Sequence, residues 1–206
     1  MQTAPPGEDL RPWFLTTRDV ADGIDPATFF DADRPLELDI GCGRGGFLVR
    51  AAEESPDRNW LGLEIDYREG RRTAKRLKRR DWGHARVVGG DAREVLAKLL
   101  LPGSVAVAHV YFPDPWWKRK HAKRRLFTDT FVDLLDRVLG PAGEVSVRTD
   151  VPEYFERVRG LMDHDKRFSR LFVTREELSP EEVATSFERK AREQNTVIDC
   201  GRWRRA

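Results

Sequence analysis

A short apolar segment followed by a glycine-rich turn constrains the fold of this chain more than any other part of its sequence. Residues 36–46 read LELDIGCGRGG, with apolar residues alternating over 36–40 and glycine at four of the next six positions. The alternation predicts a buried strand, and the glycines allow a sharp turn with no Cβ atoms between backbone and ligand. A helix is predicted over 46–54. This order is typical of the nucleotide-binding end of an open parallel sheet.

The spacing of the glycines is compatible with two classes of ligand. Gly41, Gly43 and Gly46 fit the G-x-G-x-x-G pattern of dinucleotide-binding enzymes. Gly41, Gly43 and Gly45 fit the G-x-G-x-G turn of S-adenosylmethionine-dependent methyltransferases. Asp39 favours the second class, because its charge would repel a pyrophosphate and attract the amino group of a methionine moiety. A tight turn without a ligand is the third interpretation.

The length and composition predict one globular domain. The chain has 206 residues, and 37 Lys and Arg against 35 Asp and Glu give a net charge of +2. Four prolines within residues 1–33 predict a partly irregular N-terminal arm, so the domain is expected over 34–206. No apolar run reaches the ~18 residues of a membrane span. Because no secretory leader, disulfide pattern or metal-ligand spacing is visible, we expect a cytoplasmic protein without a metal, either monomeric or homodimeric.

Two acidic residues follow later strands of the predicted sheet. Strands are predicted over 59–64 and 85–89, so that Glu64 ends the first and Asp91 follows the second. At the end of the second strand of such a sheet, where Glu64 stands, a carboxylate accepts hydrogen bonds from the two ribose hydroxyls of an adenosine. Asp91 would lie at the adenine and accept from its exocyclic amine. The alternatives are a surface carboxylate for Glu64 and a helix N-cap for Asp91, before the helix predicted over 92–100.

The most specific segment is FPDPWWKRKHAKRR at residues 112–125, which leaves a nearly continuous apolar strand predicted over 104–112. Two prolines fix the direction of Asp114 between them. Trp116 and Trp117 offer flat faces for a base, and six Lys or Arg follow within eight residues. These features together favour a nucleic acid as substrate. His109, inside the strand, is interpreted as a core histidine without a functional role.

Residues 71–80, RRTAKRLKRR, lie in a helix predicted over 66–80 and are basic at seven of ten positions. A phosphate-binding surface and a solvated helix face both remain open for this run. Towards the C-terminus, helices are predicted over 128–139 and 152–162 and a strand over 144–148. Closing antiparallel strands are expected at 168–174 and 196–203. Asp150 follows the predicted strand, as a site residue or as the cap of the next helix.

These motifs together resemble the tRNA (guanine-N7)-methyltransferases over about residues 36–190. The resemblance rests on DIGCGRG at 39–45, GLE at 62–64, DAREVL at 91–96, FPDPWWK at 112–118, TD at 149–150 and TSFE at 185–188. It implies an α/β, Rossmann-like methyltransferase fold, with a mostly parallel seven-stranded sheet, helices on both faces and an antiparallel terminal strand. The family more often has glutamate where Asp39 stands.

The same resemblance implies transfer of a methyl group from S-adenosylmethionine to N7 of a guanosine in tRNA, in the variable loop. The implied cofactor-binding residues are Asp39, Gly41, Gly43, Glu64, Asp91 and Asp114. The implied guanosine-binding residues are Lys118, Asp150, Thr185 and Glu188. Asp114 would lie nearest the chemistry and is the expected catalytic residue.

Three other functions account for part of the sequence. A nicotinamide-dependent oxidoreductase of the same fold would explain the glycines and Glu64, but not Asp39 or the 112–118 motif. A non-catalytic RNA-binding module would explain the basic runs, but not a full set of acidic residues in the pocket. A methyltransferase acting on a protein or small molecule would leave the basic, tryptophan-bearing segment unexplained.

Overall fold

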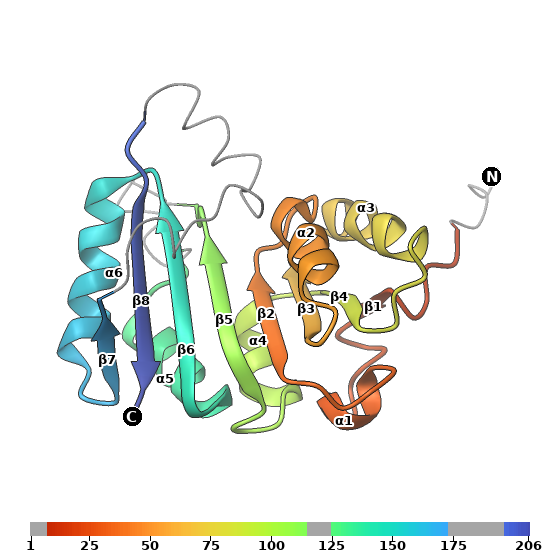
Figure 1. The fold of residues 1–206 in the computed structure, drawn as a ribbon, viewed down its shortest axis with the longest axis horizontal. Coiled ribbons are helices and arrows are strands. Elements are labelled where there is room, and N and C mark those ends of the chain that lie inside the picture. The colour runs from red at the N-terminus through yellow and green to blue at the C-terminus, as the bar shows by residue number, and fades with distance from the viewer. Residues whose placement is uncertain (1–7, 115–124, 173–195) are drawn as a thin grey trace, which may run out of the picture.

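The computed structural model describes residues 8–114, 125–172 and 196–206 of the chain, which form one eight-stranded sheet with helices packed on it (Figure 1). The strands lie in the order β1-β4-β3-β2-β5-β6-β8-β7. Their bounds are Phe14–Thr16 (β1), Leu36–Ile40 (β2), Asn59–Glu64 (β3), Ala85–Gly89 (β4), Val105–Tyr111 (β5), Leu139–Thr149 (β6), Phe168–Leu171 (β7) and Asp199–Arg205 (β8). Strands β1 to β6 pair in parallel with one another, whereas β8 pairs antiparallel with β6 and β7.

Four of the described helices begin at a residue whose side chain caps them. The bounds of all the described helices are Pro26–Phe29 (α1), Gly46–Glu54 (α2), Tyr67–Lys78 (α3), Ala92–Glu94 (α4), Val95–Leu99 (η1, a π-helix), Asp129–Val138 (α5) and Pro152–His164 (α6). The Asp66 carboxylate accepts from the first N–H groups of α3, and the Thr128 hydroxyl accepts from the Phe131 N–H at the start of α5. No helix among these described parts of the chain is long and apolar enough to cross a membrane.

Two hydrophobic cores lie on opposite faces of the sheet. On one face α2 and α3 pack together over β3 and β4, around Phe47, Trp60 and Leu77. On the other face η1, α5 and α6 pack over the middle strands, around Leu38, Phe131 and Trp203. This arrangement of helices on both faces of a mostly parallel sheet with an antiparallel end was expected from the sequence.

The sheet has one strand more than the seven expected, because part of the predicted irregular arm joins it. Residues Phe14–Thr16 pair in parallel with β4, so that Phe14 lies opposite Val87 and Thr16 opposite Gly89. The segment 92–100, for which a single helix was expected, forms two consecutive helical elements. After one turn as α4 it widens into the π-helix η1, where the Leu100 N–H donates to the Val95 carbonyl five residues back.

Candidate active site

A cleft of about 520 Å³ opens at the carboxyl ends of β2, β3, β4 and β5. Four of the sequence-predicted residues line it together: Gly41, Glu64, Asp91 and Asp114. They follow four different strands, and they meet because the carboxyl ends of parallel strands lie at one edge of a sheet. The rest of the lining is mainly apolar and includes Ile65, whose side chain is exposed there.

The backbone of the glycine turn distinguishes between the two glycine patterns. Gly41, Gly43 and Gly45 have φ angles of 83°, 52° and 67°, whereas Gly46, the first residue of α2, is not among the positive-φ residues. A Cβ atom on Gly45 would also lie 2.4 Å from the Thr73 methyl group. The conformation therefore requires glycine at the three positions of the G-x-G-x-G turn.

Glu64 is held in a fixed orientation at the end of β3. One carboxylate oxygen accepts from the Gly43 N–H at 2.8 Å, and the other accepts from the Asp66 N–H at 2.8 Å. Each carboxylate oxygen has two acceptor sites, so both can accept a further hydrogen bond from a ligand. Glu64 thus links the glycine turn to β3 and lines the cleft with two carboxylate oxygens whose orientation is fixed.

Asp91 is the N-cap of α4, which was one of the two interpretations of this residue from the sequence. Its carboxylate accepts a hydrogen bond from the Arg93 N–H. Its carboxylate also receives two hydrogen bonds from the Arg93 guanidinium, at 3.1 and 2.7 Å. These contacts hold the pKa of Asp91 below its ordinary value, so the carboxylate stays ionised in the cleft. Arg93 also lines the cleft, and sequence reasoning did not identify it.

Asp39 lies in β2, beneath the glycine turn, and is only 3% exposed. Burial, together with the nearby charge of Glu64, raises the pKa of Asp39 to about 7, and only the Leu48 N–H lowers it. Its Oδ2 atom is buried and has no hydrogen-bond partner within the part of the chain that the structure describes. A carboxylate in this position would be stabilised by a cationic ligand group that reached it.

Asp114 is exposed at the cleft, three residues beyond the end of β5. Phe112 has an unusual φ of 51°, and its N–H donates to the Arg148 carbonyl of β6 at 2.8 Å, which fixes the turn leading to Asp114. Asp150 is exposed beyond β6 and is not among the residues lining this cleft. It is not the N-cap of α6 either, since Val151 occupies that position. Lys118, Thr185 and Glu188 lie outside the described residues, as do Trp116 and Trp117.

Two residues of α3 support the glycine turn from behind, and the sequence did not reveal this role. The Thr73 hydroxyl is buried and donates to the Gly43 carbonyl at 2.7 Å. The Arg76 guanidinium donates to the carbonyls of Arg44 and Gly45, at 2.7 and 3.0 Å. The inner side of the basic run therefore orients backbone groups of the turn.

S-adenosylhomocysteine is the demethylated product of the cofactor that the resemblance implies. We expect Thr73→Val to weaken its binding about fivefold to twentyfold, because about 1–2 kcal/mol of turn stabilisation is lost with the hydroxyl. Valine matches threonine in shape, so packing against Gly45 is preserved. Calorimetric titration measures the effect, and Thr73→Ser, which keeps the donor, is the matched control. Equal affinities of the valine and serine variants would contradict a role of this hydrogen bond in positioning the turn.

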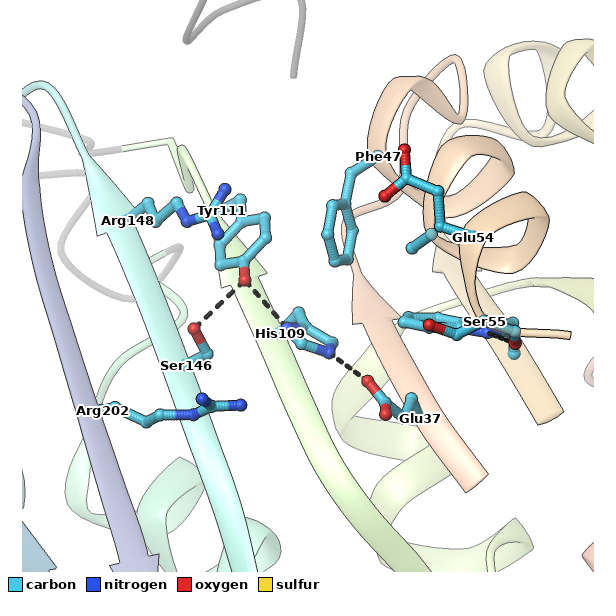
Figure 2. A pocket seen from close by; sticks show the side chains of 11 residues that line it. Glu37, Phe47, Glu54, Ser55, His109, Tyr111, Ser146, Arg148 and Arg202 are labelled. Carbon is cyan, nitrogen blue, oxygen red and sulfur yellow. Dashed lines mark hydrogen bonds and ion pairs between the residues drawn. The ribbon is translucent and has the colours of Figure 1, made fainter. Parts of the chain in front are cut away.

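A second, smaller pocket of about 170 Å³ lies between α2 and the neighbouring face of β5 and β6 (Figure 2). A chain of hydrogen bonds runs along it: Ser146 to the Tyr111 hydroxyl at 3.1 Å, Tyr111 to His109 Nδ1 at 2.9 Å, and His109 Nε2 to Glu37 at 2.7 Å. Burial lowers the pKa of His109, so its neutral ring donates through Nε2 to the Glu37 carboxylate. His109 is thus a satisfied core histidine, as the sequence indicated. Tyr111 lines both this pocket and the cleft.

Among residues 8–114, 125–172 and 196–206, no group of three or more His, Cys, Asp or Glu side chains is arranged to hold a metal ion. The charged groups that line the cleft are the carboxylates of Glu64, Asp91 and Asp114 and the guanidinium of Arg93, and the carboxylates suit an organic ligand with hydroxyl and amine donors.

Comparisons with known proteins find methyltransferases that are similar to this chain. Residues 33–200 match a protein family described as "Putative methyltransferase". The tRNA (guanine-N(7)-)-methyltransferase of Nitrosococcus oceani is 35% identical over 181 residues, which are 87% of this chain and 75% of that protein. The enzyme of the same name from Rhodopirellula baltica is 36% identical over 156 residues, 73% of this chain and 58% of that protein. The match therefore spans less than two thirds of the Rhodopirellula protein.

Solved structures with the same fold are methyltransferases of low sequence identity. An aminoglycoside resistance methyltransferase, NpmB1, superposes with a TM-score of 0.59 at 16% identity, covering 94% of this chain and 95% of the other. A SAM-dependent methyltransferase from Aquifex aeolicus gives a TM-score of 0.58 at 11% identity, covering 88% and 94%. These likenesses confirm the Rossmann-like methyltransferase fold that the sequence predicted.

Proposed function

Because the chain belongs to the tRNA (guanine-N7)-methyltransferase family, we propose that it transfers a methyl group from S-adenosylmethionine to N7 of a guanosine in the variable loop of tRNA. The observation that carries the proposal is the meeting of Gly41, Glu64, Asp91 and Asp114 in one cleft. Such a protein works where tRNA is processed, in the cytoplasm. We further propose that residues 34–206 form the methyltransferase domain and that 1–33 are an arm attached to it.

The residues around the cleft fit the chemical groups of S-adenosylmethionine. The ionised carboxylate of Asp91 suits the adenine amine, and the two oriented oxygens of Glu64 suit the ribose hydroxyls. The buried Oδ2 of Asp39, with no hydrogen bond among the described residues, suits the ammonium of the methionine moiety. When bound, the cofactor supplies a methyl group on a positively charged sulfur, which becomes neutral when the methyl leaves.

Guanine N7 carries a lone pair and no proton, so its attack on the methyl carbon requires no general base. The protein must therefore align the base and stabilise the positive charge that the base acquires. We assign both tasks to Asp114, which lines the cleft, because a carboxylate can accept from guanine N1–H and from the exocyclic amine while offsetting that charge. Asp150, at the end of β6, and Lys118, Thr185 and Glu188 are proposed to hold the rest of the guanosine.

The direct test is to incubate the purified protein with unmodified tRNA and S-adenosylmethionine labelled in its methyl group, and then to map the modified base. We expect one label per tRNA at N7 of a variable-loop guanosine. Binding should weaken steeply as salt rises, because Lys and Arg contacts to phosphates release counterions. Label on another base, on protein or on small molecules only, or a flat salt response, would contradict the proposal.

A further inference from the structure

The outer side of α3 carries a stripe of cations that already holds an anionic group of the same chain. Arg71, Lys75 and Lys78 are spaced i, i+4 and i+7, so they lie on one face of the helix. The Glu8 carboxylate lies between two of them, with Oε2 at 3.3 Å from Lys75 Nζ and Oε1 at 3.1 Å from Lys78 Nζ. We call Arg71, Lys75 and Lys78 the α3 stripe.

The backbone around Glu8 is bound by the same stripe. The Arg71 guanidinium donates to the Glu8 carbonyl at 2.7 Å, and Lys78 Nζ donates to the Asp9 carbonyl at 2.9 Å. Hydrogen bonds from Lys78 and Lys75 hold the pKa of Glu8 below its ordinary value, so the carboxylate is ionised. The stripe thus engages two carboxylate oxygens and two carbonyl oxygens along a short extended segment, near the described start of the chain (Figure 1).

These contacts are easily exchanged for those of another anion. The side chains of Glu8, Lys75 and Lys78 are 47%, 46% and 35% exposed. Ion pairs at this exposure stabilise a fold only weakly, and salt screens them. A phosphate diester presents two anionic oxygens on one centre, as a carboxylate does, and its binding also releases counterions.

We propose that the α3 stripe is a binding site for a backbone phosphate of the tRNA, which Glu8 occupies when no RNA is bound. The proposal rests on the proposed function, because it assigns part of the substrate path. The inward side of the same helix, with Thr73 and Arg76, supports the glycine turn, so phosphate binding at the stripe takes place on the element behind the cofactor cleft. The run at 71–80 is therefore both structural and a phosphate site, on opposite sides of one helix.

The test measures tRNA affinity by fluorescence anisotropy at several salt concentrations, with the full-length protein. Glu8→Gln removes the competing charge, and we expect it to bind tRNA about twofold to fivefold more tightly at low salt. The double variant Lys75→Ala/Lys78→Ala should bind about tenfold more weakly, and its salt slope should fall by about two. Lys98→Ala, an exposed cation on η1 across the sheet from α3, is the matched control and should leave both quantities unchanged.

Thermal unfolding of each variant separates RNA binding from docking of the N-terminal segment. If Glu8→Gln lowers the melting temperature but leaves tRNA affinity unchanged, the contact only anchors the segment, and the proposal is overturned. An unchanged salt slope in the double lysine variant overturns it as well. If the wild-type protein binds and methylates tRNA and the variants do so equally well, this inference alone is contradicted. If the wild-type protein neither binds nor methylates tRNA, the proposed function itself is contradicted.

Discussion

Replacing Asp114 by alanine is expected to lower the rate of methyl transfer about 100-fold to 1,000-fold while the protein remains folded. Loss of one group that stabilises charge in a transition state typically costs about 2.7–4 kcal/mol. Asp114 is exposed at the cleft and lies beyond the end of β5, so its removal leaves no cavity and no unpaired buried group. Single-turnover methylation at saturating S-adenosylmethionine measures the rate, and thermal unfolding measures the fold.

Two further variants separate the roles of charge and hydrogen bonding at this position. Asp114→Asn keeps one acceptor but loses the charge, and we expect a rate between those of the wild type and the alanine variant. Asp57→Ala removes another exposed carboxylate, from the loop between α2 and β3, and it should behave like the wild type. Near wild-type methylation by Asp114→Ala would show that another residue holds the guanine.

The second large effect is expected at Asp39, in the dependence of stability on pH. Burial and the Glu64 charge raise the pKa of Asp39 in the folded protein to about 7, from an ordinary value of 3.8. The folded state therefore binds the Asp39 proton more tightly than the unfolded state does. This contribution to stability is fully present below about pH 4 and is lost as the pH rises through 7, a change of roughly 4 kcal/mol at most.

Asp39→Asn should remove this pH dependence. The difference in melting temperature between the variant and the wild type should be several degrees more favourable to the variant at pH 8 than at pH 5. Comparing the two pH values cancels the constant cost of burying the asparagine amide. Asp57→Asn is the control and should show no such difference. If the difference in melting temperature between Asp39→Asn and the wild type did not change with pH, ionisation of Asp39 would not destabilise the folded protein, and the prediction would be wrong.

Cofactor binding should respond to the same substitution in the opposite direction. The carboxylate that destabilises the empty fold at pH 8 is the group proposed to bind the ligand ammonium, so Asp39→Asn should weaken S-adenosylhomocysteine binding. A charge-assisted hydrogen bond at a buried site contributes about 1.5–3 kcal/mol, which corresponds to roughly 10-fold to 150-fold in affinity. Unchanged affinity at pH 8 would contradict the proposed contact while leaving the stability prediction intact.

The sequence predicted those residues of the candidate site that lie at the carboxyl ends of strands. Glu64, Asp91 and Asp114 each follow an apolar run, and the rule that parallel strands end at one edge is enough to bring them together. The glycine pattern alone left two ligand classes open. The backbone shows which glycines the turn itself requires, because φ is positive at Gly45 and not at Gly46, and a glycine's conformation cannot be deduced from its presence.

The sequence could not predict contacts that depend on how helices rotate and pack. Thr73 lies on the buried side of α3, and its hydrogen bond to the Gly43 carbonyl depends on the register between α3 and the turn. Arg93 follows Asp91 by two residues, and nothing in its type shows that it pairs with that carboxylate. Strand β1 was missed because three residues among prolines have no clear period.

Strand β1 also protects the sheet. The Phe14 ring lies so close to Gly89 that a Cβ atom there would be 2.7 Å from its Cζ atom, and the strand covers the edge of β4 next to the loop that carries Asp91. An open edge is a template for pairing with other chains. Strand β1 covers the five-residue edge of β4 with an edge of only three residues, which leaves less unpaired backbone open to other chains. A shortened protein that lacked Phe14–Thr16 would expose the edge of β4 beside the cleft.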